Sequence, residues 1–194
     1  INLITINYNN IYMKILVTGA CGFIGFSFIN NVLKINPKIK IIGIDNINDY
    51  YSVKLKKDRL NQLKKIKNFS FYKIDICNNK KLEKIFVKNK INCIYHFAAQ
   101  AGVRYSIDHP RKYIDANIMG YFNILEMTRV YGIKKLIYAS SSSVYGEQTK
   151  FPLNEKLLLN PKNTYALSKL FDERLSDIYA NTYNLKIIGM RFFT

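Results

Sequence analysis

The stretch "KILVTGACGFIGFSFI" (residues 14–29) joins an apolar run to a second apolar segment through three glycines, Gly19, Gly22 and Gly25. A strand that ends at Thr18 and turns sharply into a helix needs positions without a side chain. One such position lies in the turn itself, one lies beside a phosphate bound at the helix start, and one lies where the helix packs on the strand. Glycines that serve only a tight turn are the alternative, because the triplet alone is a weak signal. The stretch predicts a dinucleotide-binding turn that other residues have to support.

A carboxylate further along the chain gives that support. Asp45 ends the next apolar run, about 20 residues beyond the last glycine, where a carboxylate accepts hydrogen bonds from both ribose hydroxyls. An acid at this position repels the 2′-phosphate of NADP, and neither Asn46 nor Ile47 beside it is basic. The sequence therefore predicts NAD as the cofactor.

Strand and helix patterns alternate along the chain. The apolar, β-branched runs indicate strands buried on both faces, and amphipathic segments between them indicate helices. The runs are "KILVTG" (14–19), "IKIIGID" (39–45), "FSFYKID" (69–75), "INCIYHFAA" (91–99), "KKLIYASS" (134–141) and "LKIIGMRF" (185–192). The expected helices span about 22–35, 52–66, 78–89, 109–131 and 164–183. This alternation predicts an α/β fold with a doubly wound sheet of six parallel strands, which binds ligands beyond the carboxyl ends of its strands.

The length of 194 residues and the hydrophobic content of 48% suit one globular domain, or a domain plus part of another. Residues 1–12 precede "MKILVTGA" and are expected to be a disordered extension, so the dinucleotide-binding domain is expected over 13–194, incomplete at its carboxyl end. No apolar run is long enough to cross a membrane, and residues 1–30 lack a signal-peptide pattern, which favours the cytoplasm.

Cysteine, histidine and charge each exclude a class of site. The three cysteines form no C-x-x-C pair and are interpreted as reduced, mostly buried thiols, and neither His96 nor His109 has a metal-ligand partner at useful spacing, so no metal is expected. The net charge of +17 comes from lysines scattered along segments such as "SVKLKKDRLNQLKKIKN" (52–68). Solvated helix faces explain such a pattern better than a nucleic-acid or membrane partner.

A second constellation combines "SSSSVYG" (140–146) with "YALSK" (165–169). Tyr165 and Lys169 are four residues apart in a helix opened by "PKNT", so they share one face. An ammonium group close to a phenol stabilises the phenolate, which lets the tyrosine act as a base at neutral pH. The pair is common by chance, but here it comes after a serine cluster at the end of a strand in a dinucleotide-binding pattern.

These motifs carry a resemblance to a known family. From Met13 to Thr194 the chain resembles the extended short-chain dehydrogenases/reductases of the nucleotide-sugar epimerase and dehydratase family, and within it the UDP-glucuronate 4-epimerase branch. The segments that carry it are "VTGACGFIG" (17–25), "GIDNINDYY" (43–51), "FAAQAGVRYS" (97–106), "YASSSSVYG" (138–146), "YALSK" (165–169) and "GMRFFT" (189–194).

The resemblance implies a set of residues that bind the cofactor. They are Gly19, Gly22, Gly25, Asp45 and Asn46, then Asp75 and Ile76 near the adenine, Ala98, Ala99 and Gln100 toward the nicotinamide, and finally Asn117, Tyr165 and Lys169. A polar helix residue satisfied by the backbone is the alternative interpretation of Asn117. The resemblance also implies a UDP-sugar substrate, and a homodimer formed through the helices at about 109–131 and 164–183.

The family's chemistry implies how the catalytic residues act. Tyr165 takes the proton of the sugar 4-hydroxyl while NAD takes hydride from C4, and Lys169 holds the nicotinamide ribose. Ser141 matches the family's catalytic serine or threonine, with Ser142 as the alternative because four serines are consecutive. Hydride then returns to the other face of the 4-keto sugar, so NAD is regenerated.

The choice among substrates depends on the residues beside two of the motifs. Ser142 and Ser143 stand where dehydratases of the family carry Asp-Glu, and decarboxylases have an acid in the same stretch. Thr194 stands where UDP-galactose 4-epimerases carry asparagine. Hydroxyl donors suit a carboxylate at C5, so Ser142 and Thr194 are expected to contact it, and UDP-glucuronate is the expected substrate. Arg104 is a further expected substrate contact. The alternatives are those three related activities and, in another class, a non-catalytic NAD-sensing or nucleic-acid-binding protein.

Overall fold

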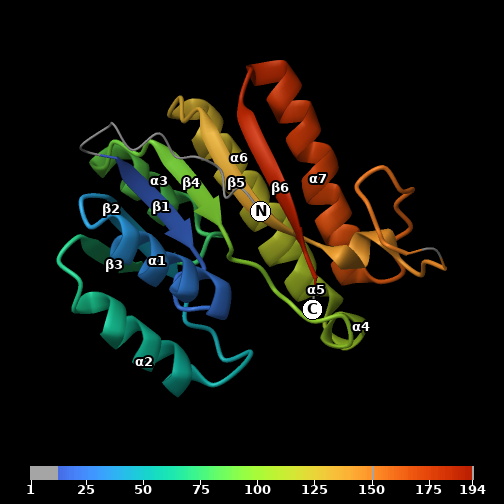
Figure 1. Ribbon diagram of the computed structural model, residues 1–194, viewed down its shortest axis with the longest axis horizontal. Coiled ribbons are helices and arrows are strands. Elements are labelled where there is room, and N and C mark those ends of the chain that lie inside the picture. Colours follow the sequence, from blue (N-terminus) through green and yellow to red (C-terminus); the bar gives the residue numbers. More distant parts are fainter. Residues whose placement is uncertain (1–12, 150, 194) are drawn as a thin grey trace.

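A single sheet of parallel strands organises the computed structural model, which describes residues 13–149 and 151–193 (Figure 1). Its order is β3-β2-β1-β4-β5-β6, so the chain winds outward from β1 first in one direction and then in the other. The strands are β1 (Lys14–Thr18), β2 (Lys40–Asp45), β3 (Phe69–Lys73), β4 (Cys93–His96), β5 (Lys135–Ser141) and β6 (Lys186–Phe192). The six predicted strands and the doubly wound α/β fold are confirmed.

Helices occupy the segments where the sequence predicts them. They are α1 (Phe23–Ile35), α2 (Val53–Lys64), α3 (Asn79–Lys88), α4 (Tyr105–Asp108), α5 (Pro110–Tyr113), α6 (Gly120–Val130) and α7 (Thr164–Tyr183). A π-helical segment, Ile114–Met119, joins α5 to α6, and a 3₁₀ turn, Ser142–Tyr145, comes directly after β5. The single helix expected at about 109–131 is therefore an α-helix interrupted by a π-helical segment, and α4 and the 3₁₀ turn are additions that the sequence did not predict.

Side-chain caps explain where several helices begin. Ser52, Asn78 and Asn163 each accept a hydrogen bond from the backbone N–H three residues later, at the starts of α2, α3 and α7. Such caps satisfy N–H groups that have no partner inside the helix. At its other end α7 stops at Asn184, whose φ of 51° places it in the left-handed region.

Two apolar cores lie on opposite faces of the sheet. One buries side chains of α1 and α2 against β1, β2, β4 and β5, and the other buries side chains of α3, α6 and α7. The prediction that all six strands are buried on both faces is wrong for two of them. Every described residue of β3 and β6 retains some exposure because these strands form the edges of the sheet.

Strand register brings separate motifs to one edge of the sheet. Thr18, the last residue of β1, pairs with Ile44 in β2 on one side and with His96 in β4 on the other. The glycine turn, Asp45 and the segment after His96 therefore all emerge together at the carboxyl edge. The extension expected at residues 1–12 lies outside the described residues.

No helix in the described part of the chain is both long and apolar enough to cross a bilayer.

Candidate functional site

A pocket of about 480 Å³ opens at this carboxyl edge. Its walls come from the turn after β1, the ends of β2 and β3, the segment after β4, and α2. Most of the predicted cofactor residues line it: Gly19, Gly22, Gly25, Asp45, Asn46, Asp75, Ile76, Ala98, Ala99 and Gln100. Among the described residues, Asn117, Tyr165 and Lys169 are not part of its lining.

The glycine turn leaves no room for side chains. Gly19 has a φ of 67°, and a Cβ built on it would lie 2.7 Å from the backbone nitrogen of Ala98. A Cβ on Gly25 would overlap the carbonyl oxygen of Gly19, and one on Gly22 would lie 3.2 Å from the same oxygen. Gly22 also caps α1 and donates its N–H to Gly19 O at 3.0 Å. The helix start therefore faces the pocket with its N–H groups unobstructed, which suits an anionic ligand.

Two backbone N–H groups hold the carboxylate of Asp45. Its Oδ2 accepts from Cys21 N at 2.9 Å, and its Oδ1 accepts from Ile47 N at 2.7 Å. Each carboxylate oxygen has more than one lone pair, so both remain able to accept a further hydrogen bond. The carboxylate is thus fixed in orientation at the pocket wall, as a pair of ribose hydroxyls requires.

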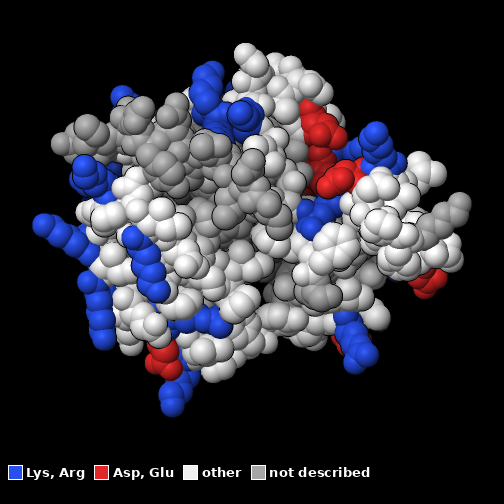
Figure 2. Space-filling model, in the orientation of Figure 1, with Lys and Arg blue, Asp and Glu red and all other residues white. Residues whose placement is uncertain are grey.

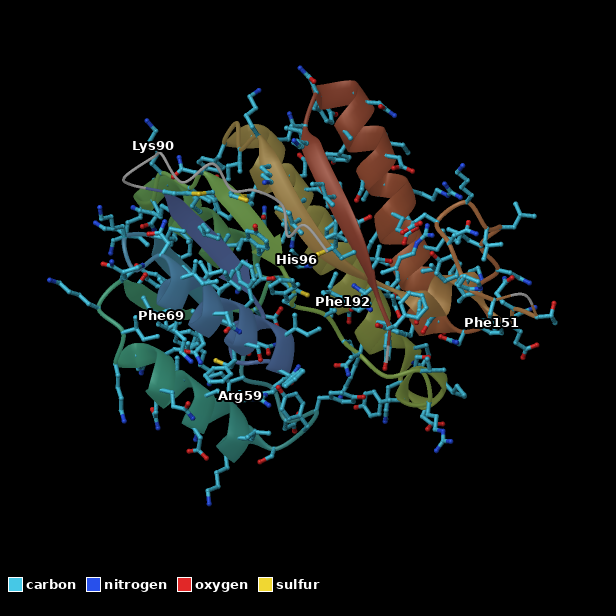
Figure 3. The ribbon with its side chains drawn as sticks, viewed as in Figure 1. Arg59, Phe69, Lys90, His96, Phe151 and Phe192 are labelled. Atoms are coloured by element: carbon cyan, nitrogen blue, oxygen red, sulfur yellow. The ribbon has the colours of Figure 1, made fainter. Side chains whose placement is uncertain are left out.

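Basic residues on α2 also reach the pocket, and no motif of the sequence indicated them. Lys56 is buried, donates to the backbone oxygen of Asn48 at 2.8 Å, and lies 4.3 Å above the Tyr51 ring. Burial lowers the pKa of Lys56, and the charge of Asp45 opposes that effect. Arg59 lies between α2 and α1 (Figure 3) and donates to Tyr51 Oη at 3.2 Å. The prediction of NAD rests on Asp45 and on the absence of a basic residue beside it in the sequence. The structure nevertheless places Lys56 and Arg59 in the same pocket as Asp45.

A second carboxylate lines the pocket beyond β3. Asp75 accepts from the side-chain amide of Asn46 at 2.9 Å and from the backbone N–H of Cys77 at 2.8 Å. Burial acts to raise the pKa of Asp75, but these hydrogen bonds outweigh it and leave the pKa below its usual value. Asp75 therefore stays ionised and holds Asn46 at the pocket wall. The prediction of mostly buried free thiols is confirmed, since Cys21 and Cys93 are buried and Cys77 is exposed.

Asn117 lies in the π-helical segment and joins two parts of the site. Its Oδ1 accepts from Gln100 N at 2.7 Å, and its Nδ2 donates to Gln100 O at 3.1 Å and to Ser168 Oγ at 2.9 Å. The side chain thus ties the segment after β4 to the first turns of α7. This geometry matches the alternative in which the backbone satisfies Asn117.

Tyr165 and Lys169 lie in the first turns of α7, as predicted. The Tyr165 ring packs edge-on against the buried ring of Tyr113, with centroids 6.0 Å apart. Lys169 is 2% exposed, and its Nζ lies 3.2 Å from Oδ2 of Asp172. The tyrosine is partly exposed while the lysine is enclosed beneath it, and Asp172 is a partner that the motif did not reveal.

The serine cluster divides its side chains between two roles. Ser140 donates to Glu173 Oε1 of α7 at 2.6 Å, whereas Ser141, at the end of β5, accepts from Ser143 N at 3.2 Å. Ser142 begins the 3₁₀ turn and is partly exposed. Successive residues of a strand point to opposite faces, so Ser140 and Ser141 have different surroundings.

The predicted substrate residues are not gathered around the pocket. Arg104 is exposed in the segment that leads into α4. Thr194 lies outside the described residues. Within residues 13–149 and 151–193, no group of three or more His, Cys, Asp or Glu side chains could hold a metal ion.

NAD fits the residues that are present. A Cβ at Gly19 or Gly25 would clash with neighbouring backbone, the helix start offers N–H groups to a pyrophosphate, and Asp45 is oriented for ribose hydroxyls. Dinucleotides bind at this edge in doubly wound folds generally. The site thus has the features of an NAD site, and α7, which carries Tyr165 and Lys169, packs against β5 and the turn that hold the serines.

Comparisons with known proteins agree with this geometry. Residues 16–194 match the protein family described as GDP-mannose 4,6 dehydratase. Protein CapI of Staphylococcus aureus is 48% identical over 183 residues, which cover 94% of this chain and 54% of CapI. The UDP-glucuronate 4-epimerase of Thermodesulfobacterium geofontis is 45% identical over 180 residues, or 92% of this chain and 55% of that protein.

A solved structure extends the likeness to three dimensions. The UDP-glucuronic acid 4-epimerase of Bacillus cereus, in complex with UDP-glucuronic acid and NAD, superposes with a TM-score of 0.84 at 35% identity. The match covers 94% of this chain and 57% of that one. The chain thus spans about half the length of the relatives that it matches.

Proposed function

The chain belongs to the NAD-dependent epimerase/dehydratase family of extended short-chain dehydrogenases/reductases, and we propose that it takes part in the 4-epimerisation of a nucleotide sugar. UDP-glucuronate and UDP-galacturonate are the proposed pair, and NAD is the proposed cofactor. The observation that carries the proposal is the combination of a dinucleotide-type pocket with Tyr165 and Lys169 on α7. The relatives at 38–45% identity that are named as UDP-glucuronate 4-epimerases support the choice of substrate.

In the proposed reaction Tyr165 is the base. Its phenolate accepts the proton of the sugar 4-hydroxyl as hydride leaves C4, and returns that proton when hydride comes back to the other face. Ser141 donates a hydrogen bond to the same sugar oxygen, and Lys169 stabilises the phenolate by its charge. NAD, when bound, supplies the reversible acceptance of hydride. Asp45 and the glycine turn would hold the dinucleotide.

The second candidate function is a non-catalytic protein that binds nucleic acid. A continuous basic stripe would favour it. On the face drawn in Figure 2, the lysine and arginine side chains stand mostly apart around the outline of the molecule, with neutral surface between them. The presence of both Tyr165 and Lys169 also favours the enzyme.

The proposed homodimer draws support from apolar side chains that α6 and α7 leave exposed. Phe122 on α6 and Leu167, Phe171 and Ile178 on α7 are 37–59% exposed. Those on α7 recur at helical spacing, as the contact face of a helix pair does.

The test uses the complete product of the gene, incubated with UDP-glucuronate and NAD and followed by NMR. We expect UDP-galacturonate to form much faster than UDP-galactose forms from UDP-glucose. Tyr165→Phe should lower the rate by at least about a hundredfold while NAD still binds, because only the proton transfer is lost. A pentose product, dominant UDP-galactose formation, or a normal rate in Tyr165→Phe would contradict the proposal.

A further inference from the structure

A buried ion pair lies beneath the Tyr165 motif. Lys169 Nζ and Asp172 Oδ2 are 3.2 Å apart, and their side chains are 3% and 1% exposed. Asp172 Oδ1 is the buried side-chain oxygen that has no hydrogen-bond partner among the described residues. One carboxylate oxygen of Asp172 is therefore paired with Lys169, and the other accepts no hydrogen bond from the described residues.

The groups packed around Asp172 offer it one positive charge. On α7 it faces Lys169 and Glu173, on α6 it faces Tyr121, and on β5 it faces Tyr138. Glu173 is already engaged in two hydrogen bonds with Arg191 of β6, at 2.9 and 2.8 Å. The Tyr121 hydroxyl lies 2.6 Å from Ser176 Oγ. Asp177, which adds a longer-range negative charge at both tyrosines, is exposed and pairs with Arg174.

The surroundings of Asp172 do not make its buried carboxylate a source of folding stability. Removing two charges from water costs more than an imperfect ion pair recovers, so burial alone selects against such a pair. Burial outweighs the attraction of Lys169 and raises the pKa of Asp172 to about 7. The carboxyl group therefore changes charge near neutral pH, directly beside the lysine.

We propose that Asp172 is a positioning residue for Lys169 and that its carboxylate favours the oxidised, positively charged nicotinamide over the reduced, neutral one. The inference rests on the proposed function, because it requires that NAD binds with its nicotinamide on the Lys169 side of the site. A lone ammonium at this place repels the pyridinium of NAD⁺. The carboxylate of Asp172 offsets that repulsion and accepts one N–H of the ammonium, which leaves the other N–H groups for the ribose.

The test compares NAD⁺ and NADH affinities by calorimetric titration of the protein used in the epimerisation test, at about pH 8.5 and about pH 5.5. At the higher pH we expect Asp172→Asn to weaken NAD⁺ relative to NADH by at least about threefold, because a negative charge is lost. Asp172→Glu keeps the charge and should restore the ratio. Asp177→Asn, a matched loss of an exposed acid on the same helix, should leave the ratio unchanged.

The unaltered chain provides a measurement that does not depend on how well a variant folds. Its preference for NAD⁺ should fall as the pH is lowered through about 7, toward the value of Asp172→Asn, whose own ratio should be insensitive to pH. Equal ratios in the unaltered chain and Asp172→Asn, or the same pH dependence in both, would overturn the role of Asp172 alone. Failure of the unaltered chain to bind either nucleotide would overturn the proposed function together with this inference.

Discussion

The side-chain oxygen of Thr18 lies 2.8 Å from Nδ1 of His96, across the neighbouring strands β1 and β4. The same oxygen accepts the backbone N–H groups of Phe97 at 3.1 Å and Ala98 at 3.0 Å. A hydroxyl has two lone pairs and one proton, so the proton of Thr18 is donated to Nδ1 and the imidazole carries its own proton on Nε2. This network anchors the start of the segment that forms one wall of the pocket.

His96 should make the protein sensitive to acid. Burial lowers the pKa of His96 to about 3 from an ordinary value of 6.5, so between these values the unfolded chain takes up a proton that the folded chain does not. The free energy of unfolding should therefore fall as the pH drops below 6.5, by about 2 kcal/mol at about pH 5 from this group. Urea unfolding at about pH 7 and about pH 5 measures it. His96→Asn retains an acceptor but cannot titrate, and an equal loss in that variant would refute the assignment to His96.

Replacing the Thr18 hydroxyl should destabilise the same region. Thr18→Val keeps the shape of the side chain but removes this partner from two partly buried N–H groups and from Nδ1 of the buried His96, at a cost of about 1–3 kcal/mol. Thr18→Ser keeps the oxygen and loses one methyl group, so it serves as the control. If Thr18→Val unfolds at the same urea concentration as the unaltered protein, the hydrogen bonds of this hydroxyl do not stabilise the fold.

Asp45 should set the choice of cofactor. Calorimetric titration should show tighter binding of NAD than of NADP, and Asp45→Asn should weaken NAD binding by about tenfold or more because a charged acceptor for the ribose is lost. Asp58→Asn, an exposed acid on α2, is the matched control for charge. The two basic residues of α2 in this pocket make the experiment informative, since equal or tighter NADP binding by the unaltered chain would show that they, and not Asp45, dominate.

Gly25 should tolerate no side chain. A Cβ there overlaps the Gly19 carbonyl, so Gly25→Ala should push α1 away from the turn, lower the free energy of unfolding by about 1–3 kcal/mol and abolish NAD binding. Asn31→Ala, at an exposed position of the same helix, controls for the change in helix propensity. Thermal unfolding and titration with NAD check both effects, and normal NAD affinity in Gly25→Ala would contradict the packing argument.

The backbone of this protein could be predicted from local patterns. The glycine spacing and the apolar runs specify where strands end and helices begin, because these depend on neighbouring residues and on which faces become buried. Position 45 could be predicted as well, since a strand end in a doubly wound sheet has a known place at the carboxyl edge. The same reasoning missed the π-helical segment around Asn117, which depends on contacts with Gln100 and Ser168.

Only the tertiary structure decided which side chains meet. The segment 52–68 offers many lysines at helical spacing, and Lys56 alone of them turns inward to the pocket because of how α2 packs on the sheet and α1. The tyrosine motif indicated Lys169 but not that Asp172, one helical turn on, would be buried with it. Thr18 and His96 are 78 residues apart, and the register of β1 with β4 makes them partners. Local sequence governs the dihedral angles of each segment, whereas burial and pairing depend on the packing of segments far apart in the chain.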